Sequence, residues 1–179
     1  MIAAVERPRL TAPVSERDHT LGPATAPVTL LEYGDYECPF CRAAHPVLKQ
    51  VLEIMGDALR FAYRHFPLTQ IHPHAYQAAE AAEAAGRQGR FWEFHDVLFA
   101  NQDRLGLRDL IAYASALALD LDQFVVDVRN HTYAGRLRED FMTGVRSGVN
   151  GTPTFFINGA RHNSGYDPET LLQALRAGL

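Results

Sequence analysis

The sequence predicts an α/β protein in which a central mixed β-sheet is flanked by helices and interrupted by an inserted helical domain. Apolar, β-capable runs occur at residues 28–33 and 59–66 and return only near the end of the chain, at residues 154–157. Helical periodicity fills residues 72–148 between them. The two cysteines lie at the start of the first predicted helix, three positions apart.

These observations divide the chain into three parts. Residues 1–26 carry prolines and scattered charges without periodicity, which predicts an arm crossing the surface. Residues 27–71 and 149–179 supply the strands of one sheet domain, and residues 72–148 form the insertion. A length of 179 residues suits one domain with such an insertion.

The run at residues 28–33 predicts a central strand, which Glu32 interrupts. This carboxylate either faces solvent or is buried beside a group that needs a proton acceptor, and burial would raise its pKa. Apolar residues at three- and four-residue steps up to Met55 then predict a helix that Gly56 ends. Residues 59–66 predict a second strand that ends at Pro67.

The insertion is predicted to be entirely helical. We expect it to fold over the two thiols as a lid. Its segments are an alanine-rich stretch at 75–85, an aromatic stripe at 91–98, and helices over 107–117, 122–128 and 133–145.

After the helical insertion, the sequence pattern becomes that of two short strands followed by a helix. Residues 154–157, the dipeptide Asn158-Gly159 and residues 160–162 predict a β-hairpin with a type I′ turn. Asp167-Pro168 then provides an N-cap residue and an N1 proline, which predict a closing helix to Leu175.

Cys38 and Cys41 are the only cysteines in the chain, in the order Cys-Pro-Phe-Cys. A helix that begins there directs free N–H groups and its dipole at the first sulfur, and such thiols have pKa values of about 3.5–7.5. We expect Cys38 to attack and Cys41 to resolve the mixed disulfide, which makes the pair a redox-active disulfide. Pro39 suits the first helical turn, and Phe40 places an apolar side chain beside the sulfurs for substrate binding.

A metal site is the main alternative for the thiols. His45 lies one helical turn after Cys41, and His72 and His74 form a second small cluster. However, a single Cys-X-X-Cys gives zinc only two of the four ligands that a structural site takes. The sequence therefore favours redox chemistry with no metal and no cofactor, and a non-catalytic peptide- or metal-binding module remains the alternative.

Composition limits the partners. The net charge is −4, and no long basic run is present, which argues against nucleic acid and anionic membranes. We find neither a signal peptide nor an apolar run of membrane-spanning length and expect a cytoplasmic protein. Reducing conditions there favour a transient catalytic disulfide over a structural one.

The order of these motifs resembles the thioredoxin superfamily. A strand, Cys-Pro-Phe-Cys at a helix start, a helical insertion and Gly151-Thr152-Pro153-Thr154 before a strand, hairpin and last helix are similar to its DsbA-like branch. The resemblance covers residues 20–178. It implies a thioredoxin-like fold and a protein disulfide oxidoreductase acting on protein or peptide thiols and disulfides, with glutathione or a thioredoxin-type protein as electron partner.

The resemblance also implies residue roles. Pro153 corresponds to the family's cis-proline, whose preceding residue, Thr152, would pair with substrate backbone and tune the thiolate. Glu32 corresponds to a buried acid that shuttles the proton of Cys41. Since Phe40 replaces the histidine of strongly oxidising members, we expect a less oxidising pair. Related proteins with helical insertions leave a glutathione-dependent isomerase or transferase as a second alternative.

Overall fold

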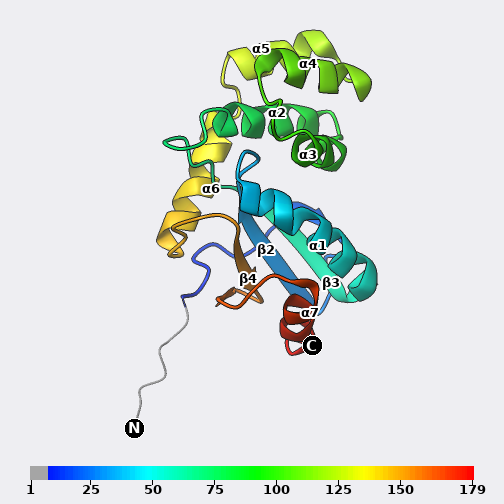
Figure 1. Ribbon diagram of the computed structural model, residues 1–179, viewed down its shortest axis with the longest axis vertical. Coiled ribbons are helices and arrows are strands. Elements are labelled where there is room, and N and C mark those ends of the chain that lie inside the picture. Colours follow the sequence, from blue (N-terminus) through cyan, green and yellow to red (C-terminus); the bar gives the residue numbers. More distant parts are fainter. Residues whose placement is uncertain (1–7) are drawn as a thin grey trace.

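The computed structural model describes residues 8–179, so the first seven residues of the predicted arm lie outside the described residues. Strands in this part of the chain form one mixed sheet in the order β1-β3-β2-β4-β5 (Figure 1). Strand β2 lies at its centre, parallel to β3 and antiparallel to β4. The strands are β1 (His19–Leu21), β2 (Val28–Gly34), β3 (Leu59–His65), β4 (Thr154–Ile157) and β5 (Ala160–His162).

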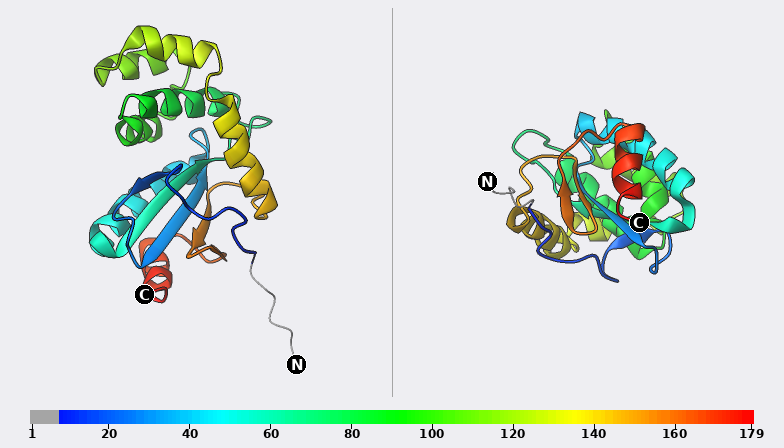
Figure 2. Two further views of the ribbon diagram at one scale, coloured as in Figure 1. Left: turned by 180° about the vertical axis from the view of Figure 1, so that it is seen from behind. Right: turned by 90° about the horizontal axis from the view of Figure 1, so that it is seen from below.

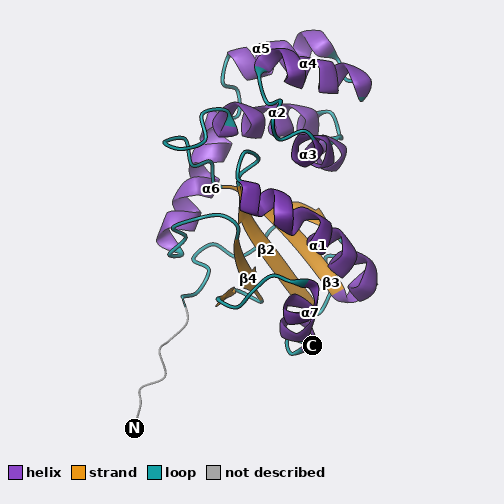
Figure 3. Ribbon diagram, viewed as in Figure 1, coloured by secondary structure: helices purple, strands orange, loops and turns teal. Residues whose placement is uncertain are grey.

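The helices fall into three groups, which Figure 3 separates from the sheet by colour. Helices α1 and α7 pack on one face of the sheet and α6 lies against the other, whereas α2 to α5 form a block beyond one end of the sheet, and this arrangement confirms the predicted fold class. None of the helices in the described part of the chain combines the length and apolar character that a membrane crossing requires. The helices are α1 (Pro39–Met55), α2 (Ala75–Arg87), α3 (Phe91–Ala100), α4 (Leu107–Ala116), α5 (Leu121–Arg129), α6 (Ala134–Arg146) and α7 (Pro168–Arg176), with a 3-10 turn at Gly56–Ala58.

The two faces of the sheet bury separate clusters, because successive side chains of a strand point to opposite faces. On β2, Leu30 belongs to the larger cluster, which also contains Cys38 and Cys41. Leu31 and Tyr33 belong to the smaller cluster on the other face. Residues from 8 to 18 and helix α6 cover this second face, as the rear view in Figure 2 shows. Glu32, two positions from Leu30, therefore shares the face of the thiols.

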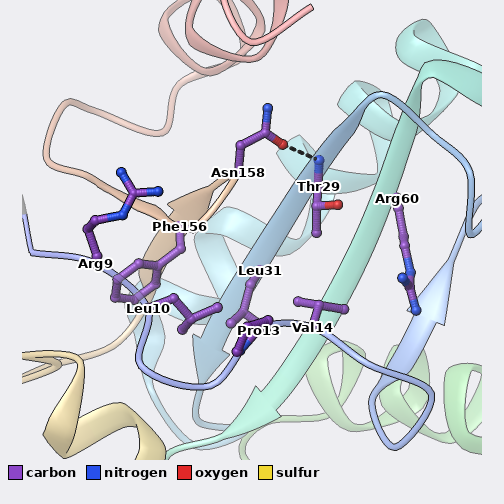
Figure 4. A pocket seen from close by; sticks show the side chains of 10 residues that line it. Arg9, Leu10, Pro13, Val14, Thr29, Leu31, Arg60, Phe156 and Asn158 are labelled. Carbon is purple, nitrogen blue, oxygen red and sulfur yellow. Dashed lines mark hydrogen bonds between the residues drawn. The ribbon is translucent and has the colours of Figure 1, made fainter.

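The segment before β2 does more than cross the surface. Strand β1 pairs antiparallel with β3 and was not predicted, because three half-buried residues carry too little periodicity to be recognised. Asp18 binds the buried guanidinium of Arg64 through two hydrogen bonds of 2.7 and 3.0 Å. A pocket of about 320 Å³ lies between this segment and the second face of the sheet. Figure 4 shows its lining, with Arg9 and Arg60 at opposite ends.

Local turn and cap chemistry determines several boundaries. Gly56, at the end of α1, has a φ of 50°. Asn158 and Gly159 have φ values of 47° and 78°, the left-handed conformation that a type I′ hairpin turn needs. Asp167 caps α7 by accepting a hydrogen bond from the backbone N–H of Thr170. The predicted hairpin and closing helix are confirmed.

Candidate active site

Cys38 is the N-cap residue of α1, and Cys41 lies in its first turn. Both are free thiols, and both are buried, with exposed fractions of 3% and 0%. The Cys38 Sγ donates a hydrogen bond of 3.3 Å to the carbonyl oxygen of Thr152. The Thr152–Pro153 peptide bond is cis. The fold thus joins the two motifs that the sequence holds more than a hundred residues apart.

The surroundings of the two thiols shift their pKa values in opposite directions. A hydrogen bond from the Cys41 thiol, aided by the Thr152 side chain and the backbone N–H groups of Cys41 and Phe40, lowers the pKa of Cys38 to about 5, although burial opposes this. Burial raises the pKa of Cys41 well above its ordinary value, and its bond to Cys38 and the charge of Glu32 add to the rise. At neutral pH Cys38 is therefore the thiolate and Cys41 the thiol.

Glu32 is 1% exposed, which excludes the solvent-facing alternative for this residue. Neither of its carboxylate oxygens has a hydrogen-bond partner among the described residues. Burial, together with the charge of Cys38, raises its pKa to about 8. A carboxyl group in this state can accept or release a proton near neutral pH, and it lies near enough to Cys41 for its charge to raise the pKa of that thiol.

The predicted substrate-binding residues reach the surface next to the thiols. Phe40, between Pro39 and Cys41, is 62% exposed, and Pro39 is also exposed. Thr152 and Pro153 are half-buried. The hydroxyl of Thr152 has no partner while Cys38 carries its proton, so it is free to donate to the thiolate.

Sequence reasoning missed a set of polar contacts that hold the turn before Cys38. Asp35 is buried, and one of its carboxylate oxygens lies 2.8 Å from His72 Nδ1 and accepts the backbone N–H of Leu68 at 2.8 Å. Glu37 lies 2.8 Å from His74 Nδ1. These contacts join residues more than 30 positions apart, so no local sequence pattern predicts them.

The histidines of the predicted metal alternative bind carboxylates instead. His45 Nε2 lies 3.1 Å from Asp96 Oδ1, and His72 and His74 are paired as described above. Within residues 8–179 no group of three or more histidine, cysteine, aspartate or glutamate side chains is arranged to hold a metal ion.

The chain is similar in sequence to a segment of Na(+)/H(+) antiporters. The chain is 48% identical over 167 residues to the Na(+)/H(+) antiporter NhaA 3 of Salinispora tropica, a match that covers 93% of this chain and 26% of that protein. It is 40% identical over 162 residues to the Na(+)/H(+) antiporter NhaA of Herminiimonas arsenicoxydans, again over 26% of that protein. The chain thus spans about a quarter of the length of these curated relatives.

Solved structures match over nearly the whole chain. A thioredoxin-like oxidoreductase from Silicibacter pomeroyi is 25% identical, with a TM-score of 0.81 over 91% of this chain and 92% of that one. BdbD from Bacillus subtilis, 20% identical, gives 0.81 over 97% and 96%. Wolbachia pipientis alpha-DsbA1, 22% identical, gives 0.78 over 94% and 93%. Since the thioredoxin family model also matches residues 14–177, this chain belongs to the thioredoxin family and has the fold of its DsbA-like thiol-disulfide oxidoreductases.

Proposed function

We propose that the protein exchanges disulfides with protein or peptide clients, with Cys38 as the attacking thiol and Cys41 as the resolving thiol. The observation that carries this proposal is a pair of free thiols at the start of α1, with the Cys38 Sγ 3.3 Å from the carbonyl oxygen that precedes the cis bond to Pro153. The pKa values of the two thiols, which shift in opposite directions, support it. Cys38 is a thiolate at pH 7, whereas Cys41 keeps its proton until it is needed. This division suits an attacking and a resolving thiol.

The exchange proceeds in two balanced steps. The Cys38 thiolate attacks one sulfur of a client disulfide, forms a mixed disulfide, and releases the second client sulfur as a thiolate. Cys41 then gives its proton to Glu32 and attacks Cys38, which forms the Cys38–Cys41 disulfide and releases the first client sulfur. The client gains two electrons and the protein loses two, and the reverse sequence oxidises a client dithiol.

Glu32 acts as the proton acceptor in the second step. Its burial on the same face of the sheet as the thiols, its unpaired oxygens and a pKa near the working pH support this role. Without such a base, a buried Cys41 with a raised pKa stays protonated and resolves slowly.

A polypeptide client is favoured by the surface around the sulfurs. The two sulfurs are nearly covered, while Phe40 is 62% exposed beside them. Ile71, in the segment that binds Asp35 through Leu68 and His72, is 68% exposed. We infer that these side chains contact apolar residues of the client, and that the client backbone lies against Thr152 and Pro153.

The test is to trap the mixed disulfide. Cys41→Ser should accumulate a covalent adduct with a disulfide-containing peptide, detected by mass and released by a reductant. Cys38→Ser should give no adduct, and the native protein should turn the peptide over without accumulating it. An adduct through Cys41 in the Cys38→Ser variant, or none in either variant, would refute the assignment. Glutathione disulfide tested in parallel shows whether a small thiol serves as electron partner.

The antiporter relatives suggest a second context for the same chemistry. A segment 48% identical to this chain forms about a quarter of a Na(+)/H(+) antiporter, so we infer that an ion antiporter is a candidate client or effector. Cys41→Ser expressed in the source cells, followed by identification of trapped proteins from the membrane fraction, tests this. Trapped antiporter supports the inference, and recovery of other clients alone overturns it.

A further inference from the structure

We propose that Gln102 is a positioning residue that holds the turn carrying Cys38 and thereby sets the reactivity of its thiolate. The inference rests on the proposed function, because it concerns the attacking thiol. Gln102 lies just after α3, in the inserted helical block, and more than 60 positions from the cysteines. Its side-chain hydrogen bonds go to the main chain of the turn and not to either sulfur, so its action on Cys38 is indirect.

One amide group makes both contacts. The Gln102 Nε2 donates to the carbonyl oxygen of Tyr36 at 2.9 Å and to the carbonyl oxygen of Cys38 at 2.8 Å. A primary amide carries two N–H donors on that nitrogen, so both are used here. The side chain therefore bridges two carbonyls on either side of Glu37 and fixes their relative orientation.

The Cys38 carbonyl oxygen accepts two hydrogen bonds. Besides the bond from Gln102, it accepts the first backbone bond of α1, from the N–H of Arg42 at 3.1 Å. Cys38 itself has the extended conformation of an N-cap residue, with φ −75° and ψ 121°, but its side chain makes no capping bond. The Gln102 amide thus supports, from outside, a helix start that lacks side-chain capping.

The consequence for the sulfur follows from where its stabilising donors lie. The backbone N–H groups of Phe40 and Cys41, which help to lower the pKa of Cys38, belong to the same first turn. If the Cys38 carbonyl is released, the peptide between Cys38 and Pro39 can rotate and the sulfur can move away from those donors. The Gln102 bonds also offset the negative ends of two carbonyl dipoles close to a thiolate.

Other contacts keep the turn folded when Gln102 is changed. The N–H of Cys38 donates to the carbonyl oxygen of Asp35 at 3.2 Å, and the N–H of Glu37 donates to the Asp35 carboxylate at 2.8 Å. Since His72 and Leu68 bind that carboxylate independently, removal of the amide is expected to perturb the turn and leave it in place.

The experiment compares Gln102→Leu with Gln88→Leu. Gln88 lies in the same helical block and makes two bonds of similar kind to the backbone of Asp120, at 3.1 and 2.8 Å, without touching the thiol turn. The readout is the pH profile of iodoacetamide alkylation of Cys38 in the reduced protein, with urea unfolding of each variant as the control for folding. This profile reports thiolate formation and requires no catalytic turnover.

We expect Gln102→Leu to lower the thiolate fraction on the acid side of the profile by about three- to tenfold, the effect of losing one or two hydrogen bonds. Gln88→Leu should leave the profile unchanged. Gln102→Asn, which keeps the amide on a side chain one methylene shorter, should fall between the two, and it serves as the test if Gln102→Leu does not fold. A native profile in Gln102→Leu, or in a folded Gln102→Asn if only that variant folds, overturns the proposal.

Failure of the proposed function gives a different result. In that case the native protein shows the acid-shifted profile but does not exchange disulfides with any peptide, while Gln102→Leu still shifts the profile. If the native protein exchanges disulfides and Gln102→Leu matches it in both profile and rate, only the role of Gln102 is rejected.

Discussion

Replacing Glu32 by glutamine removes the proposed proton acceptor while keeping the shape of the side chain. In the reduced protein the carboxyl group is buried and its oxygens are unpaired within residues 8–179, so no described hydrogen bond is lost in the exchange. Attack by Cys38 should be unaffected. The step that should slow is resolution, in which Cys41 must lose its proton.

The magnitude follows from the pKa of Glu32, which is about 8 when Cys38 is charged. At pH 7 about one molecule in ten then holds Glu32 as a carboxylate, and the fraction rises about tenfold by pH 9. In the mixed disulfide Cys38 carries no charge, so the pKa of Glu32 is lower than in the reduced protein. The rate of resolution should therefore rise with pH and level off at or below pH 8. A general base contributes about 10²- to 10⁴-fold, so Glu32→Gln should slow resolution by at least about 100-fold.

The assay is single-turnover release of a labelled peptide from a preformed Cys38 mixed disulfide, measured between pH 5 and 9. The native protein should show a rising limb that levels off near or below pH 8, and Glu32→Gln should be slower without that limb. The same pH profile in both proteins would refute the role of Glu32.

Stability provides an independent measurement at the same position. Because the native pKa of Glu32 is raised from 4.5 to about 8, its favourable contribution is complete below pH 4.5 and is lost as pH rises to 8. Glu32→Gln should therefore gain stability over the native protein across that window, by at most about 5 kcal/mol at pH 8. A stability difference between the two proteins, measured by urea unfolding, that does not vary with pH would contradict the raised pKa of the buried carboxyl group.

Three further outcomes are expected. Alkylation of Cys38 should show a pH midpoint of about 5, and a midpoint near the ordinary value of about 8.5 would contradict its stabilised thiolate. Thr152→Val should lower the thiolate fraction below that midpoint about three- to tenfold, whereas Thr152→Ser should not, and equal effects of both would exclude the hydroxyl. Gly34→Ala places a methyl group 2.5 Å from the Tyr63 ring and should cost about 1–3 kcal/mol in urea unfolding. Gly135→Ala, which meets nothing within 4 Å, is its control and should not be destabilised.

The features that sequence predicts well are those fixed by a few adjacent residues. Asn158-Gly159 can adopt the positive φ values of a tight turn, so the hairpin follows from two residues. Asp167 caps the next helix through a bond three residues away. The thiol pair needs only Cys38 and Cys41 at a helix start, and a lowered pKa of Cys38 is expected from that position. The hydrogen bond from Cys41 contributes most to the lowering, and burial raises the pKa of Cys41.

The features that sequence does not predict depend on distant partners. Both faces of β2 are buried, so alternation could not decide which way Glu32 points or whether it meets water. The bonds from Gln102 and His72 to the active-site turn join segments that only the fold brings together. Strand β1 exists because β3 offers it an edge, and its own three residues carry no strand signal.

The most direct test of the account is a redox titration of the Cys38 and Cys41 pair. The protein is equilibrated in glutathione buffers of graded potential, and the oxidised fraction is measured by mass after thiol trapping. A Cys38 pKa of about 5 lies between about 7 for thioredoxin and about 3.5 for DsbA, whose potentials are about −270 and −120 mV. Interpolation predicts a reversible two-electron transition near −180 mV. The absence of any transition between those two limits would contradict the proposed thiol-disulfide exchange.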